Sequence, residues 1–338
     1  MHNQIFPRTS LHAPFGLLVL TLVVHCFLSG DILHAKSHAG SSGASFVQGI
    51  GYSVIDSLRI RLQQDSNNLG LRWQYANNLY ESNFSQEALQ ECRRILAQDS
   101  TFVPVYLTIG AMLTSQATDA SDSTKARQAL RHLAKITNPT MDLPGGSKAY
   151  MTLFFQAQNY CTLGEYNTAI QLLNQYIALD STNGYVYYQR YSAQAAQSCV
   201  RSTYDLDRAI LYTKTKLQPY FYVDRAGVRL TMGEVDSARA DAERAISLGI
   251  ESGHSYTFLA GALHDQKQYK LAFEAITKAF TFPTVPALAY CFRGLLRMER
   301  QEYGSAIEDF DEFLKRGKSI SEDVIKYINQ VKEWYAQQ

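Results

Sequence analysis

The sequence predicts an all-α protein made of stacked helical hairpins, and repeated spacings in its C-terminal half carry this prediction. One series of alanines keeps a step of 34 residues (272 − 238 = 34; 306 − 272 = 34): Ala238, Ala272 and Ala306. A second series of small residues keeps the same step twelve residues earlier: Ala226, Ala260 and Gly294. Two small residues in each period allow two antiparallel helices to approach closely, and a period of this length is typical of a hairpin array.

Composition is ordinary for a packed globular chain and argues against two classes of ligand. The 338 residues include 32 Lys and Arg against 31 Asp and Glu, which gives a formal net charge of +1. Hydrophobic residues make up 46% of the chain, enough for a packed interior. A neutral chain without a basic stripe has no electrostatic reason to bind nucleic acid or an anionic membrane surface.

The first thirty residues differ in character from the rest of the chain. An apolar run over 15–28 follows Arg8 and ends in small residues. Its length of about fourteen residues is that of a signal-peptide core and is short for a membrane span. We expect residues 1–30 to be a secretory signal or membrane anchor, and residues 31–49 to be a flexible linker. Lipidation of Cys26 is a weaker alternative, because His25 stands where a small residue usually precedes a lipid-modified cysteine.

The predicted helices follow in order from an amphipathic stretch over 52–64. Its ending, Gln64-Asp65-Ser66, recurs as Gln98-Asp99-Ser100 and resembles 179–181, and each copy indicates a helix end that runs into a turn. The third hairpin is predicted over 150–163 and 167–179, with Gly164 in the tight turn and Ala169 at the close approach. Equivalent turns are predicted at 233–235 and 301–303.

These segments resemble tetratricopeptide repeats (TPRs), most clearly at 293–296 and 303–310. The resemblance covers about residues 50–318. It implies a right-handed superhelical solenoid of about seven hairpins, which binds a protein or peptide partner without an enzymatic activity or a cofactor. Our prediction is therefore a solenoid over 50–318, closed by a capping helix over 319–338.

Several departures from the regular repeat are visible. Serine replaces the proline that commonly ends the second helix. An insertion lies around 117–123, and a long loop occupies 137–146. The register is lost and recovered in the fourth repeat, where the second helix is expected to be cut short at Pro219. The last segment carries a capping-box pattern, Ser319 to Glu322, and then an apolar stripe that fits a capping helix or a partner-binding helix: Val324, Ile328, Val331 and Tyr335.

No sequence motif indicates catalysis. Phosphate-binding, zinc-protease and paired-cysteine motifs are missing from the sequence. His254 and His264 lie near one predicted helix, but two histidines without a third ligand do not define a metal site. The acidic residues of 308–312 are interpreted as a solvated face. The cysteines after the leader are interpreted as free thiols, mostly buried: Cys92, Cys161, Cys199 and Cys291.

In TPR proteins the first helix of each hairpin lines a concave face, which implies candidate positions around each small residue. The candidates that could contact a peptide are Trp73, Asn77, Tyr80, Phe154, Gln158, Gln189, Thr257 and His264. No Lys or Arg occurs at these positions, so recognition of acidic tails is not implied. The competing interpretation makes some of them core residues, and unfolding of a Trp73→Ala, Phe154→Ala variant would favour it.

The predicted function is a non-enzymatic scaffold for protein–protein contacts, exported to the periplasm or cell envelope. A second hypothesis makes the chain an anchored structural component of an envelope assembly or secretion complex. A third places an unrecognised enzymatic site at the 137–146 loop, which would require clustered titratable side chains there. The sequence leaves the partner and the oligomeric state open.

Overall fold

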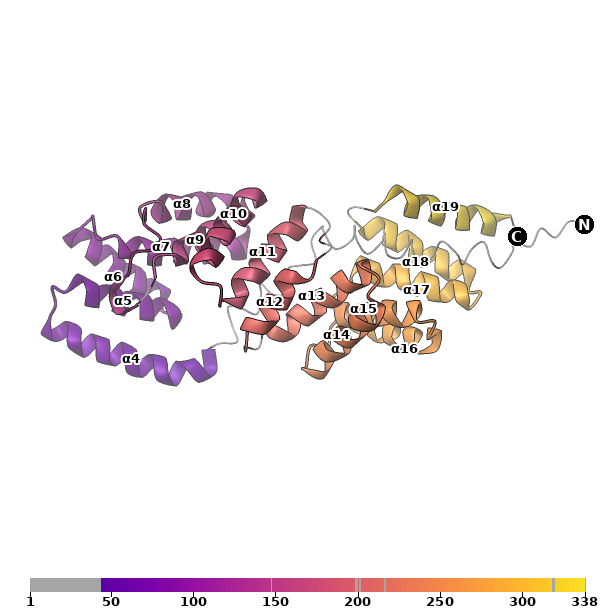
Figure 1. The fold of residues 1–338 in the computed structure, drawn as a ribbon, viewed down its shortest axis with the longest axis horizontal. Coiled ribbons are helices and arrows are strands. Elements are labelled where there is room, and N and C mark those ends of the chain that lie inside the picture. The colour runs from indigo at the N-terminus through magenta and orange to yellow at the C-terminus, as the bar shows by residue number, and fades with distance from the viewer. Residues whose placement is uncertain are drawn as a thin grey trace, which may run out of the picture. The chain divides into compact units, whose positions relative to one another are not determined.

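The computed structural model describes residues 44–146, 148–197, 200, 202–215, 217–317 and 320–337, with side chains from Val54 onward. In this part of the chain every regular element is helical (Figure 1), and the only bridge joins Asp142 and Lys148. The described residues divide into two compact units, one up to Ala193 and one from Gln194. The all-α class of stacked hairpins is confirmed. The expected leader over 1–30 and most of the expected linker lie outside the described residues.

The first unit contains three complete hairpins. Its elements are α4 (Ala44–Gln64), α5 (Leu69–Glu81), α6 (Ser85–Gln98), α7 (Pro104–Ala120), α8 (Ser123–Leu133), the 3₁₀ turn η3 (Pro144–Gly146), α9 (Met151–Thr162), α10 (Tyr166–Leu179) and the start of α11 (Gly184–Gln197). Helices α5, α7 and α9 are the first helices of the three hairpins, and each packs against the next. Helix α4 packs on α5 through Ile55, Leu58 and Leu62, which are buried.

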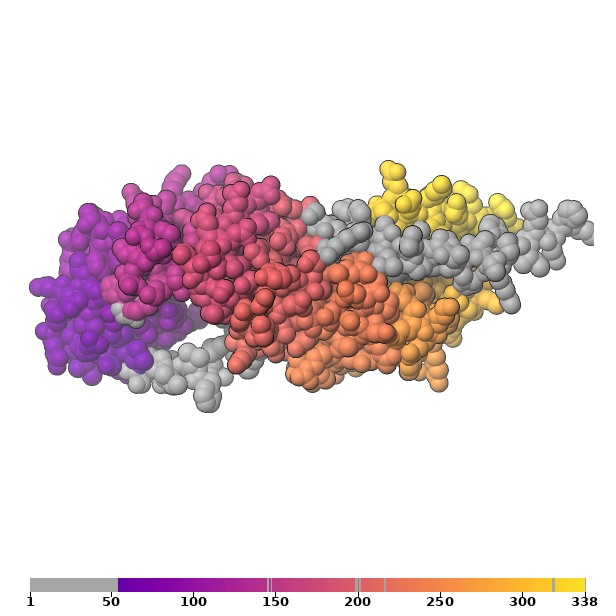
Figure 2. Space-filling view, viewed as in Figure 1, coloured from indigo at the N-terminus to yellow at the C-terminus, as the bar shows by residue number. Residues whose placement is uncertain are grey.

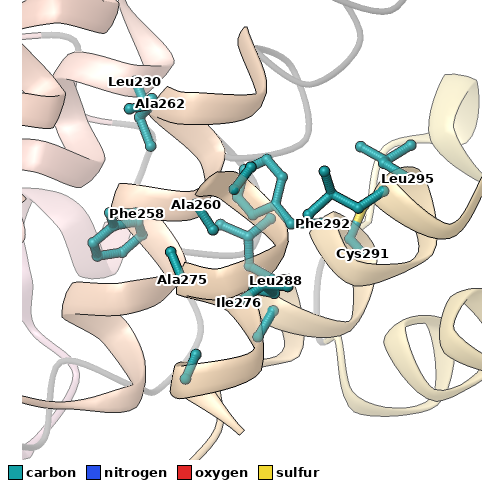
Figure 3. Packing of buried hydrophobic residues seen from close by; sticks show 14 of the residues in the cluster. Leu230, Phe258, Ala260, Ala262, Ala275, Ile276, Leu288, Cys291, Phe292 and Leu295 are labelled. Atoms are coloured by element: carbon teal, nitrogen blue, oxygen red, sulfur yellow. The ribbon is translucent and has the colours of Figure 1, made fainter. Parts of the chain in front are cut away.

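The second unit also contains three complete hairpins. Its elements are α12 (Tyr204–Tyr212), α13 (Gln218–Thr231), α14 (Val235–Ser247), α15 (Gly253–Asp265), α16 (Tyr269–Ala279), α17 (Ala287–Glu299), α18 (Tyr303–Arg316) and α19 (Glu322–Ala336). One apolar cluster runs through α13 to α19, and Figure 3 shows Phe258, Ile276 and Phe292 among its members. In the space-filling view, side chains fill the space that the ribbon leaves between neighbouring helices (Figure 2).

The two series of small residues stand where the helices of a hairpin touch. All five alanines of the series are 0% exposed. A Cβ atom added to Gly294 would lie 2.7 Å from Cε1 of Phe310 and 3.2 Å from the carbonyl oxygen of Ala306. The predicted reason for the 34-residue spacing, close approach of two backbones, is therefore confirmed.

The turn between the two helices of a hairpin repeats its backbone conformation as well. Gly164 has φ +78° and Gly233 has φ +76°, as a tight left-handed turn requires. The same conformation recurs 34 and 68 residues after Gly233, at Lys267 (φ 59°) and Gln301 (φ 63°). The left-handed turn is therefore a property of the repeat, and glycine is not obligatory in it.

Gly253 is the glycine whose replacement should cost most among the helical glycines. A Cβ atom there would lie 2.2 Å from the carbonyl oxygen of Thr284, which is backbone and cannot rotate away. We expect Gly253→Ala to lower the free energy of unfolding by about 1–3 kcal/mol. The matched control is Gly304→Ala, because its added Cβ meets nothing closer than 3.4 Å. Urea unfolding followed by circular dichroism compares the two, and equal midpoints would contradict the expectation.

In each of two hairpins of the second unit, buried ion pairs join the first helix to the second. The sequence did not predict these ion pairs. In α13 and α14, Asp241 accepts hydrogen bonds from both Arg225 (2.7 and 2.8 Å) and Arg229 (2.7 Å). Arg225 also donates to Asp207 of α12 at 2.7 Å. We call this arrangement of one aspartate and two arginines a clamp.

A second clamp lies in α17 and α18, 68 residues further on. Asp309 accepts from Arg293 (2.6, 2.9 and 3.1 Å) and from Arg297 (2.8 Å). The guanidinium of Arg293 also lies 3.5 Å from the ring centroid of Phe280. The side chain of Asp309 is only 3% exposed, so the interpretation of 308–312 as a solvated face is wrong for this residue. Its neighbour Glu308 is exposed, as expected.

The irregular repeats differ in detail from the prediction. The residues of the expected insertion extend α7 to Ala120, and Ser121 (φ 52°) then turns the chain. Helix α12 does end early, at Tyr212, but Pro219 lies in the first turn of α13, which begins at Gln218, and does not end α12. Helix α4 begins at Ala44, so residues 44–49 of the expected linker are helical.

The last helix, α19, covers the end of the second unit. Val324, Ile328 and Val331 are at most 3% exposed and belong to the apolar cluster of that unit. Tyr335, the fourth residue of the expected stripe, is 43% exposed. The helix begins at Glu322 with Ser321 as its N-cap, two residues later than the N-cap of the expected capping box, and Ser319 lies outside the described residues. The capping role of α19 is confirmed.

Candidate functional site

Trp73, the first expected groove residue, lies in the interior of the first unit. Its side chain is 1% exposed, and its indole nitrogen donates a 3.0 Å hydrogen bond to the hydroxyl of Thr108 on α7. Burial of the indole is favourable because its ring leaves water while its N–H group keeps a hydrogen bond, here with Thr108. Trp73 is therefore a core residue between two first helices, and its indole offers no surface to a partner.

Asn77 and Tyr80 lie on the same side of α5 but remain partly exposed. The Asn77 amide accepts from Thr108 at 3.2 Å and donates to Glu81 at 2.7 Å. The Tyr80 hydroxyl donates to the backbone carbonyl of Ala111 at 3.3 Å. Burial raises the pKa of Tyr80, and a hydrogen bond with Ser115 opposes that rise. Both side chains therefore join α5 to α7 while they keep an accessible edge.

Phe154 belongs to an aromatic cluster instead of an open groove. Its ring lies 5.6 Å from Phe155, 5.7 Å from Tyr185 and 6.4 Å from Tyr176, measured between centroids. The side chain is 7% exposed. Such edge-to-face contacts fix a core, and Phe154 packs α9 against α10 and the start of α11.

Gln158 and Gln189 are the expected residues with side-chain amides on α9 and α11, and both are partly exposed. Gln158 follows Phe154 by one helical turn on α9, and its backbone carbonyl accepts from Thr162 at 3.2 Å. Gln189 hydrogen-bonds the hydroxyl of Tyr185, whose pKa burial raises. Together with Asn77 and Tyr80, these residues give the first unit partly exposed polar positions on α5, α9 and the start of α11.

Thr257 and His264, the two candidates in the second unit, are buried on α15. Thr257 is 0% exposed and donates to the carbonyl of Gly253 in its own helix at 2.6 Å. His264 is 9% exposed, and its Nδ1 lies 3.1 Å from a carboxylate oxygen of Asp265. Both candidates of the second unit are therefore buried within it and offer no open surface on α15. Among the described residues, no three His, Cys, Asp or Glu side chains are placed to hold a metal ion.

The loop over 137–146 folds into a compact strap, which we define as residues 138–146 together with Lys148 and Ala149; Ser147 lies outside the described residues. The backbone N–H of Ala149 donates to the carbonyl of Met141 at 3.1 Å, and Lys148 pairs with Asp142. Leu143, 4% exposed, belongs to the same apolar cluster as Trp73. The charged side chains of the strap therefore pair with each other, and they do not form the titratable cluster that an enzymatic site there would require.

Cys92, Cys161 and Cys291 are not paired in disulfides, and the first and last of them are buried as small apolar residues. Cys92 is 0% exposed and Cys291 is 2% exposed, while Cys161 is partly exposed. Burial is the main reason that the pKa of Cys92 rises to about 12. The interpretation as buried thiols is confirmed for Cys92 and Cys291, and Cys199 lies outside the described residues.

Comparison with solved structures defines the class of fold. A chain of the APC/C hetero-tetramer Cut9–Hcn1 matches 83% of this chain at 15% identity, with a TM-score of 0.51. This chain spans about half of that one (52%). MamA matches 54% of this chain at 24% identity (TM-score 0.42; 92% of MamA). The C-terminal part of a TPR repeat-containing protein from Cytophaga hutchinsonii matches 75% at 15% identity (TM-score 0.45; 98% of that chain).

The described residues thus have the helical-hairpin fold of TPR proteins. At these levels of identity the likeness shows the fold alone. No protein-family model matches the sequence, and the comparison with curated proteins found no match. Within the described part of the chain, none of the helices combines the length and apolar character that crossing a bilayer requires.

Proposed function

We propose that this protein is a non-enzymatic scaffold that holds an extended segment of a protein partner on the first unit. The observation that carries the proposal is the set of partly exposed polar side chains on α5 and α9, Asn77, Tyr80 and Gln158. Amide side chains can both donate to and accept from the backbone of an extended segment. The neighbouring α7 contributes Ser115 and Asp119, which lie 3.5 Å apart.

The electrostatics of this surface support a segment that is not strongly acidic. Burial is the main cause of the raised pKa of Tyr80, and the nearby carboxylates of Asp119 and Glu81 raise it further. No Lys or Arg stands at the expected groove positions. A carboxylate-rich segment would therefore be repelled here, whereas a neutral or basic segment would not.

Photo-crosslinking tests the proposal. A benzoylphenylalanine at Gln158 should capture a partner in living cells, while the same group at Glu87, exposed on the second helix α6, should not. Once a partner segment is identified, Asn77→Ala with Gln158→Ala should weaken its binding by about tenfold. This corresponds to two lost hydrogen bonds of about 0.7 kcal/mol each. Equal capture at Gln158 and Glu87 would contradict the proposal.

We further propose that the protein is exported and works in the cell envelope, because residues 1–30 have the composition of a secretory signal or anchor. The alternative is an anchored structural component of an envelope assembly. Fractionation with and without detergent separates the two: an anchored chain stays with the membranes until detergent is added. Recovery only in the cytosol would contradict both.

A further inference from the structure

The two turns that lead out of α6 and α10 have the same sequence and the same hydrogen bonds. Asp-Ser-Thr stands at 99–101 and again at 180–182. In both copies the aspartate carboxylate accepts from the backbone N–H of the threonine (2.8 and 2.9 Å) and from its hydroxyl (2.6 and 2.7 Å). We call these two segments the twin turns. Each joins one helical hairpin of the first unit to the helix that follows.

The serine of each twin turn offers its side chain to solvent and does nothing for the fold. Ser100 and Ser181 are exposed, and neither hydroxyl makes a hydrogen bond with another described residue. Only their backbone carbonyls are used, which accept from the hydroxyls of Tyr106 at 2.7 Å and Tyr187 at 3.2 Å. Proline, which commonly stands here in TPRs, supplies the same carbonyl and also fixes φ. The fold therefore gives no reason for a hydroxyl at either position.

We propose that Ser100 and Ser181 are acceptor sites for O-linked sugars. The serine Oγ forms a bond to the anomeric carbon of a sugar donor activated by a nucleotide or lipid phosphate. The bond from that carbon to the phosphate breaks, and the hydroxyl proton passes to a base of the transferase. The inference rests on the proposed export of the chain, because a kinase that uses ATP would not meet it in the envelope.

The carboxylate fixed beside the serine favours a neutral group over a phosphate. The hydroxyl and the backbone N–H of Thr101 lower the pKa of Asp99, so this carboxylate stays ionised at neutral pH. A phosphate on Ser100 would bring about two more negative charges to the same turn and would be repelled. A sugar carries no charge, and its hydroxyls can donate to the carboxylate.

The position of the twin turns also makes their serines accessible to an enzyme. Both turns lie outside the helices, since α6 ends at Gln98 and α10 ends at Leu179. A transferase can therefore reach the hydroxyl without opening a helix. A third Asp-Ser-Thr, at 122–124, lacks this property because α8 begins at Ser123. The proposal is accordingly limited to the twin turns.

Mass spectrometry of the protein purified from its native cells tests the inference. We expect peptides that contain 99–101 and 180–182 to carry the added mass of sugar residues, located on Ser100 and Ser181 by electron-transfer fragmentation. Mild alkali should remove the sugars by β-elimination and leave dehydroalanine at both positions. Ser57 is the matched control: it is exposed and follows an aspartate, but it lies inside α4 and should carry no sugar.

Three variants show whether the hydroxyl and the turn are what the transferase recognises. Asp99→Ala removes the hydrogen bonds of the first turn and should abolish the sugar at Ser100, while Ser181 in the same molecules keeps its sugar as an internal reference. Ser100→Ala should lose the sugar as well. Ser100→Thr, which retains a hydroxyl, should keep it.

Three results would overturn the inference: unmodified serines in both twin turns, the mass of a phosphate in place of a sugar, and sugar on Ser57 at the level found on Ser100. The proposed export is tested separately by fractionation. Unmodified twin turns contradict this inference wherever the chain is found, whereas recovery of the chain only in the cytosol contradicts the proposed export.

Discussion

Replacement of Asp309 by alanine is expected to lower the free energy of unfolding by about 3 kcal/mol, because it leaves two arginines without their carboxylate in a largely buried site. Arg293 and Arg297 both depend on Asp309, and each is 23% exposed. Urea unfolding followed by circular dichroism measures the loss.

Two further variants make this expectation specific. Glu308→Ala, at the exposed neighbour, should change stability by less than about 0.5 kcal/mol. Asp241→Ala should cost less than Asp309→Ala, because Arg225 keeps its 2.7 Å bond to Asp207. A loss at Glu308 as large as the loss at Asp309 would show that the clamp is not its cause.

Replacement of Trp73 by alanine is expected to cost about 3–5 kcal/mol, since it removes a fully buried indole and opens a cavity between α5 and α7. The loss should appear as a lower unfolding midpoint, measured by urea titration with circular dichroism. For the joint variant Trp73→Ala, Phe154→Ala, the groove interpretation predicts weaker partner capture with helical content near that of the wild type, whereas the burial of both side chains predicts loss of the fold.

Gln158→Ala is the matched control for this variant. Gln158 is partly exposed and its amide takes no part in the core, so its unfolding midpoint should stay near that of the wild type. If Trp73→Ala instead unfolds at the wild-type midpoint and only loses the partner, the indole must be part of the contact surface.

The fold could be predicted from sequence because its cause is local and repeated. Ala238, Ala272 and Ala306 are each 0% exposed, and a larger side chain would not fit where two helices touch. The clamps also have a pattern in the sequence, because the residue types of Arg225, Arg229 and Asp241 stand again 68 residues later, in the second clamp. They were missed because an arginine or aspartate in an amphipathic helix ordinarily faces water.

The candidate site was less predictable, because burial depends on segments far away in sequence. Trp73 and Asn77 lie one turn apart on the same face of α5, but Trp73 is buried and Asn77 is partly exposed. The difference depends on the apolar cluster around Trp73, which includes Leu143, about seventy residues later in the chain. Helical spacing shows which residues share a face. It does not show what covers that face, and the strap has no repeat pattern that would reveal its place.

The alternation of the clamps has a mechanical consequence for the hairpin between them. At the positions equivalent to Arg225, Arg229 and Asp241, the α15–α16 hairpin carries Leu259, Leu263 and Ala275. Ion pairs constrain the direction as well as the distance between two helices, whereas apolar contacts constrain them through close packing alone. The α15–α16 hairpin therefore relies on packing at these three positions, while the hairpins on either side add directional ion pairs, so we expect the second unit to bend most readily at α15 and α16.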